Sequence, residues 1–147
     1  KREASSGLLD ALQKDGTKIY PNFYKEEQTK NVESTLRIFK KRTEIDLECL
    51  MEGSFPEDEN EIAIDRMYAV NNKISVGDVM ELGDVSYTIC GLVALSDYSA
   101  LFSSTSDMMF DAVRFGVAIV IFTTIIHGVT ASVRQMRKRQ RHSANLF

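Results

Sequence analysis

The chain has 147 residues, of which 44% are apolar and 27% charged, a balance that is typical of globular proteins and excludes wholesale disorder. This length suits one ordinary domain or two very small ones. All 21 acidic residues lie at or before Asp111, whereas five of the 18 basic residues lie between Arg134 and Arg141. Because the body is acidic and the basic tail lacks interleaved aromatic residues, we expect no sequence-specific nucleic-acid partner.

The first 42 residues predict a helix and one or two strands. The leucines at positions 8, 9 and 12 predict the end of an amphipathic helix that stops at Asp15-Gly16, and its beginning is expected further upstream. Residues 17–24, TKIYPNFY, read as an extended segment or an edge strand, because proline cannot donate to a sheet ladder. Residues 34–42, STLRIFKKR, alternate around Leu36 and Ile38 and predict a strand.

Residues 43–53, TEIDLECLMEG, alternate more regularly and predict a half-buried strand. One predicted face is apolar (Ile45, Leu47, Cys49 and Met51), and the other is mostly acidic (Glu44, Asp46, Glu48 and Glu52). Cys49 and Cys90 are 41 residues apart, which fits neither a zinc site nor a redox pair. Both fall in predicted strands, where we expect buried thiols, and a disulfide remains open if the region is extracytoplasmic.

The next 50 residues alternate between strands and short helices. Residues 61–65 (EIAID) predict a strand and residues 66–72 (RMYAVNN) one or two helical turns. Residues 78–82 and 86–95 predict two strands joined by a hairpin turn at Gly83-Asp84, while Gly77-Asp78 redirects the chain before them. Ser96 and Ser106 are expected to cap short helices.

The last part of the chain divides into an apolar segment and a basic tail. Residues 115–133 contain no charged residue and precede the basic tail 134–147. The segment is either a single membrane span with a cytoplasmic C-terminus or a buried strand, FGVAIVIF, followed by a basic helix. We therefore divide the chain into a body of residues 1–114, the apolar segment 115–133 and the tail 134–147.

Three kinds of chemistry are disfavoured by the motifs. The acidic residues 57–65 lack the central glycine of a calcium loop and are expected to be solvated, so no metal site is predicted. The only histidines, His127 and His142, are not expected to reach Ser96, Ser99 or Cys90 in a pocket. No phosphate-binding glycine motif is present, so we expect neither an enzyme nor a bound cofactor.

A cluster of aromatic and methionine side chains near residue 100 predicts a partner-binding surface. Such side chains adapt well to partner contacts, although the alternative is that they cap the core. The predicted surface consists of Tyr98, Phe102, Met108, Met109 and Phe110.

Taken together, residues 49–102 resemble the extracytoplasmic, MacB-like domain of FtsX-like ABC transporter permeases, and the resemblance extends over about residues 8–120. The motifs are Gly53 with Pro56, Glu61 to Ile64, the short helix from Arg66, Ile74 to Asp78, and Ile89 to Val93. The resemblance implies an α+β fold, a mixed sheet flanked by helices with a small β-subdomain around the Gly-Asp turns.

The resemblance further implies a non-catalytic domain that binds a substrate or partner and couples it to a separate ATP-binding subunit. It would lie on the extracytoplasmic side of the cell membrane, as one part of a larger permease, and a homodimer is a further possibility. The alternative function is a small single-span membrane protein with an acidic outer domain and a basic cytoplasmic tail.

Overall fold

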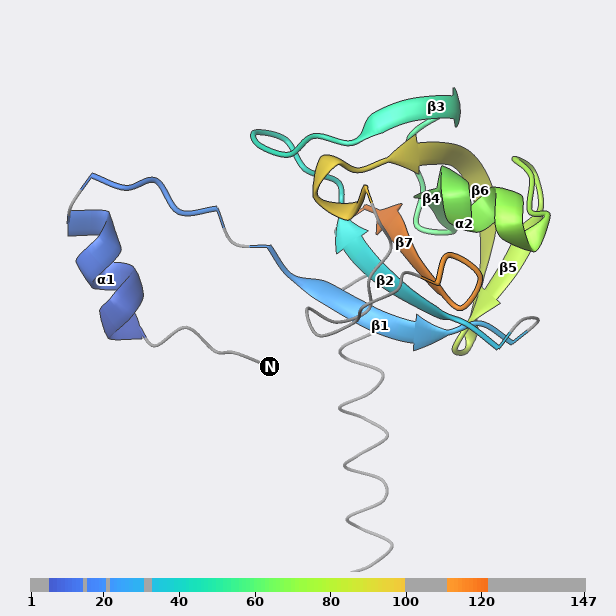
Figure 1. Cartoon of the computed structure of the whole chain (residues 1–147), viewed down its shortest axis with the longest axis horizontal. Helices are drawn as coiled ribbons and strands as arrows, with labels where there is room; N and C mark the ends of the chain where they lie inside the picture. Colours follow the sequence, from blue (N-terminus) through green and yellow to red (C-terminus); the bar gives the residue numbers. More distant parts are fainter. Residues whose placement is uncertain (1–5, 15, 21, 31–32, 100–110, 122–147) are drawn as a thin grey trace, which may run out of the picture.

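The computed structural model describes residues 6–14, 16–20, 22–30, 33–99 and 111–121. These residues form one curled sheet with a helix packed against it, and a second helix before it (Figure 1). The elements in chain order are α1 (Ser6–Lys14), β1 (Tyr24–Gln28), β2 (Thr35–Lys40), β3 (Cys49–Gly53), β4 (Glu61–Asp65), α2 (Arg66–Asn72), β5 (Val79–Leu82), β6 (Val85–Ala94), the 3-10 helix η1 (Ser96–Tyr98) and β7 (Phe115–Val120).

The sheet is mixed, which confirms the predicted α+β class. Its strand order is β1-β2-β7-β4-β6-β3, and β5 also pairs with β6. The pairs β2–β7 and β4–β6 are parallel, whereas the remaining pairs are antiparallel. A bridge between Thr29 and Leu82 joins the β1 side to β5, so the sheet curls until these two segments meet. The strands around the Gly-Asp turns belong to this same sheet.

Helix α2 and strand β7 form the centre of the core. Asp65 caps α2, because its Oδ1 accepts a hydrogen bond from the backbone N–H of Tyr68 at 3.0 Å. The fully buried Tyr68 ring lies over Gly116, where a Cβ atom would come within 2.5 Å of the ring. The Tyr68 hydroxyl is 2.6 Å from Ser34 Oγ, so its polar end is satisfied inside the core. Glycine at position 116 is therefore what allows α2 to pack this closely.

Strand β7 changes the expected domain boundary. All six of its residues are buried, and it lies between β2 and β4 in the sheet. The α+β body therefore continues past residue 114, and Phe115–Val120 are part of its core. The remainder of the apolar segment, from residue 122, and the basic tail lie outside the described residues. None of the helices that the structure describes has the length and hydropathy needed to cross a bilayer.

The strand predicted over residues 43–53 is shorter than expected, and its predicted faces are wrong. Only Cys49–Gly53 form a strand, and all five residues are exposed. Asp46 has a φ of 47°, which interrupts the extended run, and Leu47 is 55% exposed. Glu48, expected on the solvent face, is instead buried. Among the described strands β3 pairs only with β6, with a register irregularity between Leu50 and Glu52, and side chains on both of its faces are exposed.

The edge strand expected near the N-terminus begins later than the aromatic segment that predicted it. Residues 17–20 and 22–23 have no regular structure, and β1 starts at Tyr24. The charged sequence YKEEQ becomes a strand because it pairs along its length with β2, from Tyr24 opposite Phe39 to Gln28 opposite Thr35.

The two Gly-Asp turns have different geometries. Gly83, with a φ of 58°, lies in the two-residue connection between Leu82 and Val85. Gly77 has a φ of 96°, and its N–H donates to Ile89 O at 2.8 Å. This second turn therefore brings the chain alongside β6 just before β5 begins.

Candidate functional site

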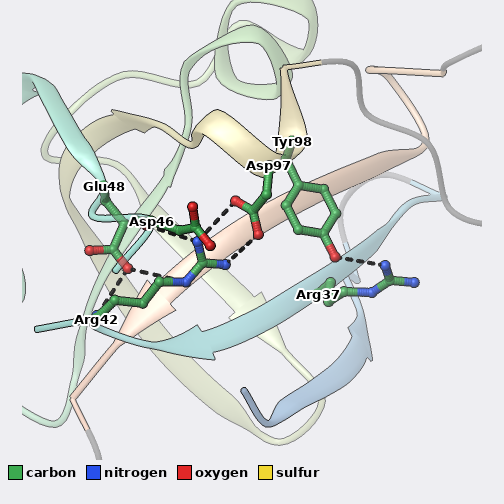
Figure 2. A network of polar contacts seen from close by, with 6 residues as sticks. All are labelled: Arg37, Arg42, Asp46, Glu48, Asp97 and Tyr98. Carbon is green, nitrogen blue, oxygen red and sulfur yellow. Dashed lines mark hydrogen bonds and ion pairs between the residues drawn. The ribbon is translucent and has the colours of Figure 1, made fainter. Parts of the chain in front are cut away.

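A network of arginine contacts connects β2 to the 3-10 helix η1 (Figure 2). Arg42, two residues after β2, donates from Nη1 and Nη2 to the two carboxylate oxygens of Asp97 at 2.9 and 2.8 Å. Its Nη1 also donates to the backbone oxygen of Asp46 at 2.8 Å, and its guanidinium carbon lies 5.3 Å from the centre of the Phe39 ring. The Arg42 side chain is only 10% exposed. This bidentate geometry fixes both the position and the orientation of the Asp97 carboxylate.

Glu48 supplies a second carboxylate on the other side of Arg42. Its side chain is 1% exposed, and Oε1 accepts from the Arg42 backbone N–H at 3.0 Å. Arg42 Nε faces the same oxygen at 4.0 Å and finds no hydrogen-bond partner among the described residues. Burial opposes the charge on Arg42, but the hydrogen bonds and charge of Asp97 outweigh it and raise the arginine pKa. Arg42 therefore stays ionised and balances two acidic groups.

Arg37 forms the second half of the network, on β2 itself. Its Nη1 donates to the Tyr98 hydroxyl at 2.9 Å, while Nε and Nη2 donate to Glu26 of β1 at 2.9 and 2.7 Å. The guanidinium carbon lies 4.6 Å from the ring centre of Tyr24 and 4.9 Å from that of Phe115. These cation–π and hydrogen-bond contacts attach the last residue of η1 to three strands at once.

The network holds η1 in place. Ser96 was expected to cap a helix, but Leu95 occupies the N-cap position, and no side chain makes a cap hydrogen bond there. The turn is held instead by Asp97 and Tyr98, which contact arginines 55 and 61 residues earlier in the chain. No local spacing pattern indicates such long-range contacts, so the sequence did not predict Arg37 and Arg42 as site residues.

The predicted partner surface is only partly described. Tyr98 is half-buried, and its ring packs against Phe39 with the ring centres 5.7 Å apart. The other predicted members of the surface, Phe102, Met108, Met109 and Phe110, lie outside the described residues. Of the predicted surface, the structure therefore describes Tyr98 alone.

The two cysteines differ in environment, and the expectation that both are buried is wrong for Cys49. Cys49 is exposed on β3, whereas Cys90 is buried on β6, and both are free thiols. Burial, with a smaller contribution from Glu61, raises the pKa of Cys90 to about 11, so this thiol is a poor nucleophile near neutral pH. Of the other candidates for nucleophilic chemistry, Ser96 and Ser99 lie in and after η1, and His127 lies outside the described residues.

The acidic loop before β4 has a local structural role. Glu61 Oε2 accepts from the backbone N–H groups of Glu57 and Asp58 at 2.9 and 3.2 Å. Over the part of the chain that the structure covers, no group of three or more acidic, histidine or cysteine side chains is arranged to hold a metal ion.

No protein-family model, curated protein or solved structure matches this chain.

Proposed function

We propose that this chain is the extracytoplasmic domain of an FtsX-like ABC transporter permease, and that it binds a partner and transmits conformational change without catalysis. The proposal starts from the motifs between residues 49 and 102. In the structure these motifs form β3, β4, α2, β5, β6 and η1, which are successive parts of one sheet and its attachments.

The observation that carries the proposal is the placement of the two chain connections to the sheet. Tyr24, where β1 begins, pairs with Phe39 near the end of β2. Phe39 in turn pairs with Ile119 near the end of β7. The chain therefore enters and leaves the sheet at the same end, on strands separated by β2 alone. A domain inserted between two anchored segments needs this arrangement, because both connections must reach the same base.

The same three strands carry the arginine network. The Arg37 guanidinium of β2 contacts Glu26 of β1 and the Phe115 ring of β7. It also donates a hydrogen bond to the Tyr98 hydroxyl. A displacement of the connections to β1 or β7 would thus act directly on the strands that anchor η1. This supports a coupling role in which residues following η1 contact a partner.

The location can be tested with the exposed Cys49 and the buried Cys90. Intact cells of the source organism, freed of any outer envelope, are treated with a membrane-impermeant maleimide before and after lysis. The proposal expects Cys49 to be labelled in intact cells, while Cys90 remains unlabelled until the protein is denatured. Labelling of Cys49 only after lysis would place the domain in the cytoplasm and contradict the proposal.

The coupling role requires a second experiment on the assembled complex. An antibody against the folded chain is used to purify it from native membranes, and the bound proteins are identified by mass spectrometry. We expect an ATP-binding cassette subunit among the bound proteins. Transported substrate should stimulate ATP hydrolysis less in the complex that carries Asp97→Ala than in the control complex that carries Arg114→Ala. Arg114 is 76% exposed and 3.9 Å from its acidic neighbour Asp111, so its loss should not change coupling.

A further inference from the structure

Strand β3, Cys49–Gly53, forms one edge of the sheet among the described strands. Among the described strands β3 pairs only with β6 and ends the strand order of the sheet. All five of its residues are exposed, including Leu50 at 37% and Met51 at 51%. A strand in this position presents backbone N–H and C=O groups to which a further strand can be added.

The segment before β3 extends this exposed apolar surface. Ile45 is 45% exposed and Leu47 is 55% exposed, although both belong to an alternating pattern that would normally serve a core. The same types of residue are buried elsewhere in the sheet, for example Ile62 and Ile64 on β4. Apolar side chains grouped along an open strand edge are typical of a protein contact.

The charge of this region restricts what can bind there. Between Glu44 and Asp65 the sequence has nine acidic residues and no lysine or arginine. Glu52 on β3 and Glu57 and Asp58 just after it are exposed. Three cations lie near this stretch. Lys18 is 2.7 Å from Glu44, Arg42 contacts Glu48 and the backbone oxygen of Asp46, and Lys41 lies 4.2 Å from the Phe55 ring centre.

These three properties select one class of occupant. A second copy of this chain would bring two acidic edges together, and its own Glu52 would approach the first copy's carboxylates at a cost in free energy. A basic strand would instead satisfy the backbone edge, cover Leu50 and Met51, and neutralise the acidic flanks. We infer that the β3 edge binds an extended segment of a partner protein in which apolar residues alternate with lysine or arginine. This inference does not depend on the transporter proposal.

A short synthetic peptide that alternates valine and lysine tests the inference directly. Binding to the full chain is measured by titration calorimetry, and its location by amide hydrogen exchange. We expect slower exchange at residues 49–53 and slower alkylation of Cys49, with the buried Cys90 as the internal reference. Because charge attraction adds to the strand pairing, affinity should fall about tenfold between 0.1 and 1 M salt, over which the Debye length shortens from about 10 to about 3 Å.

Two control peptides separate backbone pairing from charge alone. A peptide with glutamate in place of lysine should not bind, because it repels the acidic edge. A lysine peptide with proline in place of valine keeps the charge, but it lacks the N–H group at every second residue and cannot extend the sheet as a regular strand, so it should also fail. If the proline peptide binds as well as the valine peptide, the contact is nonspecific charge attraction and the inference is overturned.

A matched pair of protein variants tests the site. Glu52→Lys should weaken binding about fivefold or more, because reversing one cross-strand charge replaces an attraction with a repulsion. Glu33→Lys makes the same change in net charge at an exposed position before β2 and should leave binding unchanged. Equal effects of the two variants would overturn the inference. Two further results would also overturn the inference. One is a free chain that sediments as a dimer and in which β3 is already protected from amide exchange. The other is protection of β3 in the free chain that disappears when the five basic residues of the tail are replaced by glutamine.

Discussion

The strongest test of the arginine network is a double-mutant cycle on Arg42 and Asp97. The variants are Arg42→Ala, Asp97→Ala and the pair together, and the cycle isolates the interaction between the two side chains. Arg42 is 10% exposed and Asp97 33% exposed, so the pair is neither a surface pair nor a fully buried one. Exposed pairs contribute about 0–1 kcal/mol, whereas breaking a buried pair costs about 3–5 kcal/mol.

The structure gives an expected magnitude for each step of this cycle. Arg42→Ala removes both hydrogen bonds to Asp97 and the cation nearest the buried Glu48, so it should destabilise the fold by about 3 kcal/mol. Asp97→Ala leaves Arg42 its contacts with Glu48 and with Asp46 O, so it should cost about 1.5 kcal/mol. The coupling energy from the cycle should be about 1–2 kcal/mol, because the two hydrogen bonds are charge-assisted and the Arg42 side chain is only 10% exposed.

The assay is urea unfolding followed by far-ultraviolet circular dichroism for all four proteins. The control cycle uses Lys30 and Glu81, which are 3.3 Å apart but 55% and 46% exposed, and should give a coupling of about 0.3 kcal/mol or less. In 1 M salt the control coupling should vanish while that of Arg42 and Asp97 persists. A coupling below about 0.5 kcal/mol for Arg42 and Asp97 would refute the argument that this pair anchors η1.

Three further predictions concern the core and the thiols. Gly116→Ala should destabilise the fold by about 2–3 kcal/mol in urea unfolding, because its Cβ would lie 2.5 Å from the Tyr68 ring; an unchanged midpoint would contradict the packing. Burial raises the pKa of Asp65 above its ordinary 3.8, because it penalises the charged carboxylate. The contribution of the neutral carboxyl to the free energy of unfolding is therefore fully present below pH 3.8 and is lost as pH rises through the folded-state pKa. Asp65→Asn keeps a capping oxygen and should therefore gain stability relative to the wild type across that rise, with no difference at the lowest pH. Iodoacetamide at pH 8 should alkylate Cys49 at least 100-fold faster than Cys90, of which about one part in a thousand is thiolate at a pKa of about 11; equal rates would show that β6 opens readily.

Sequence patterns predicted those elements whose neighbours are close in the chain. The alternation of Leu36 and Ile38 gave β2, and the Gly83 turn between two β-forming runs gave the β5–β6 hairpin. The one or two helical turns predicted over residues 66–72 coincide with α2, Arg66–Asn72, and in the structure Asp65 supplies a local cap at its start. In each case the information lies within about ten residues of the element.

The errors arose where a distant strand decides the outcome. The alternation over residues 43–53 predicts extended chain, but only pairing with β6, including the irregularity between Leu50 and Glu52, decides which side chains are covered. The same limit hid Arg42 and Asp97, which are 55 residues apart, because single side chains in separate elements leave no periodic signal. Strand β1 was missed for a local reason: its charged residues show no apolar alternation, and they form a strand by pairing with β2, the next strand in the chain.

Arg42 links the two surfaces of this protein. Through Asp97 it fixes η1, and through its contacts with Asp46 O and Glu48 it also fixes the loop that leads into β3. An added strand on β3 would act on this loop, and Arg42 is the direct polar contact through which that effect could reach η1. If so, the basic peptide should slow amide exchange at Tyr98, whose N–H donates to Leu95 O, in the wild type but not in Arg42→Ala. Slowing in both proteins would mean that the two surfaces communicate through the sheet itself, by way of β6, which pairs with β3 and ends just before η1.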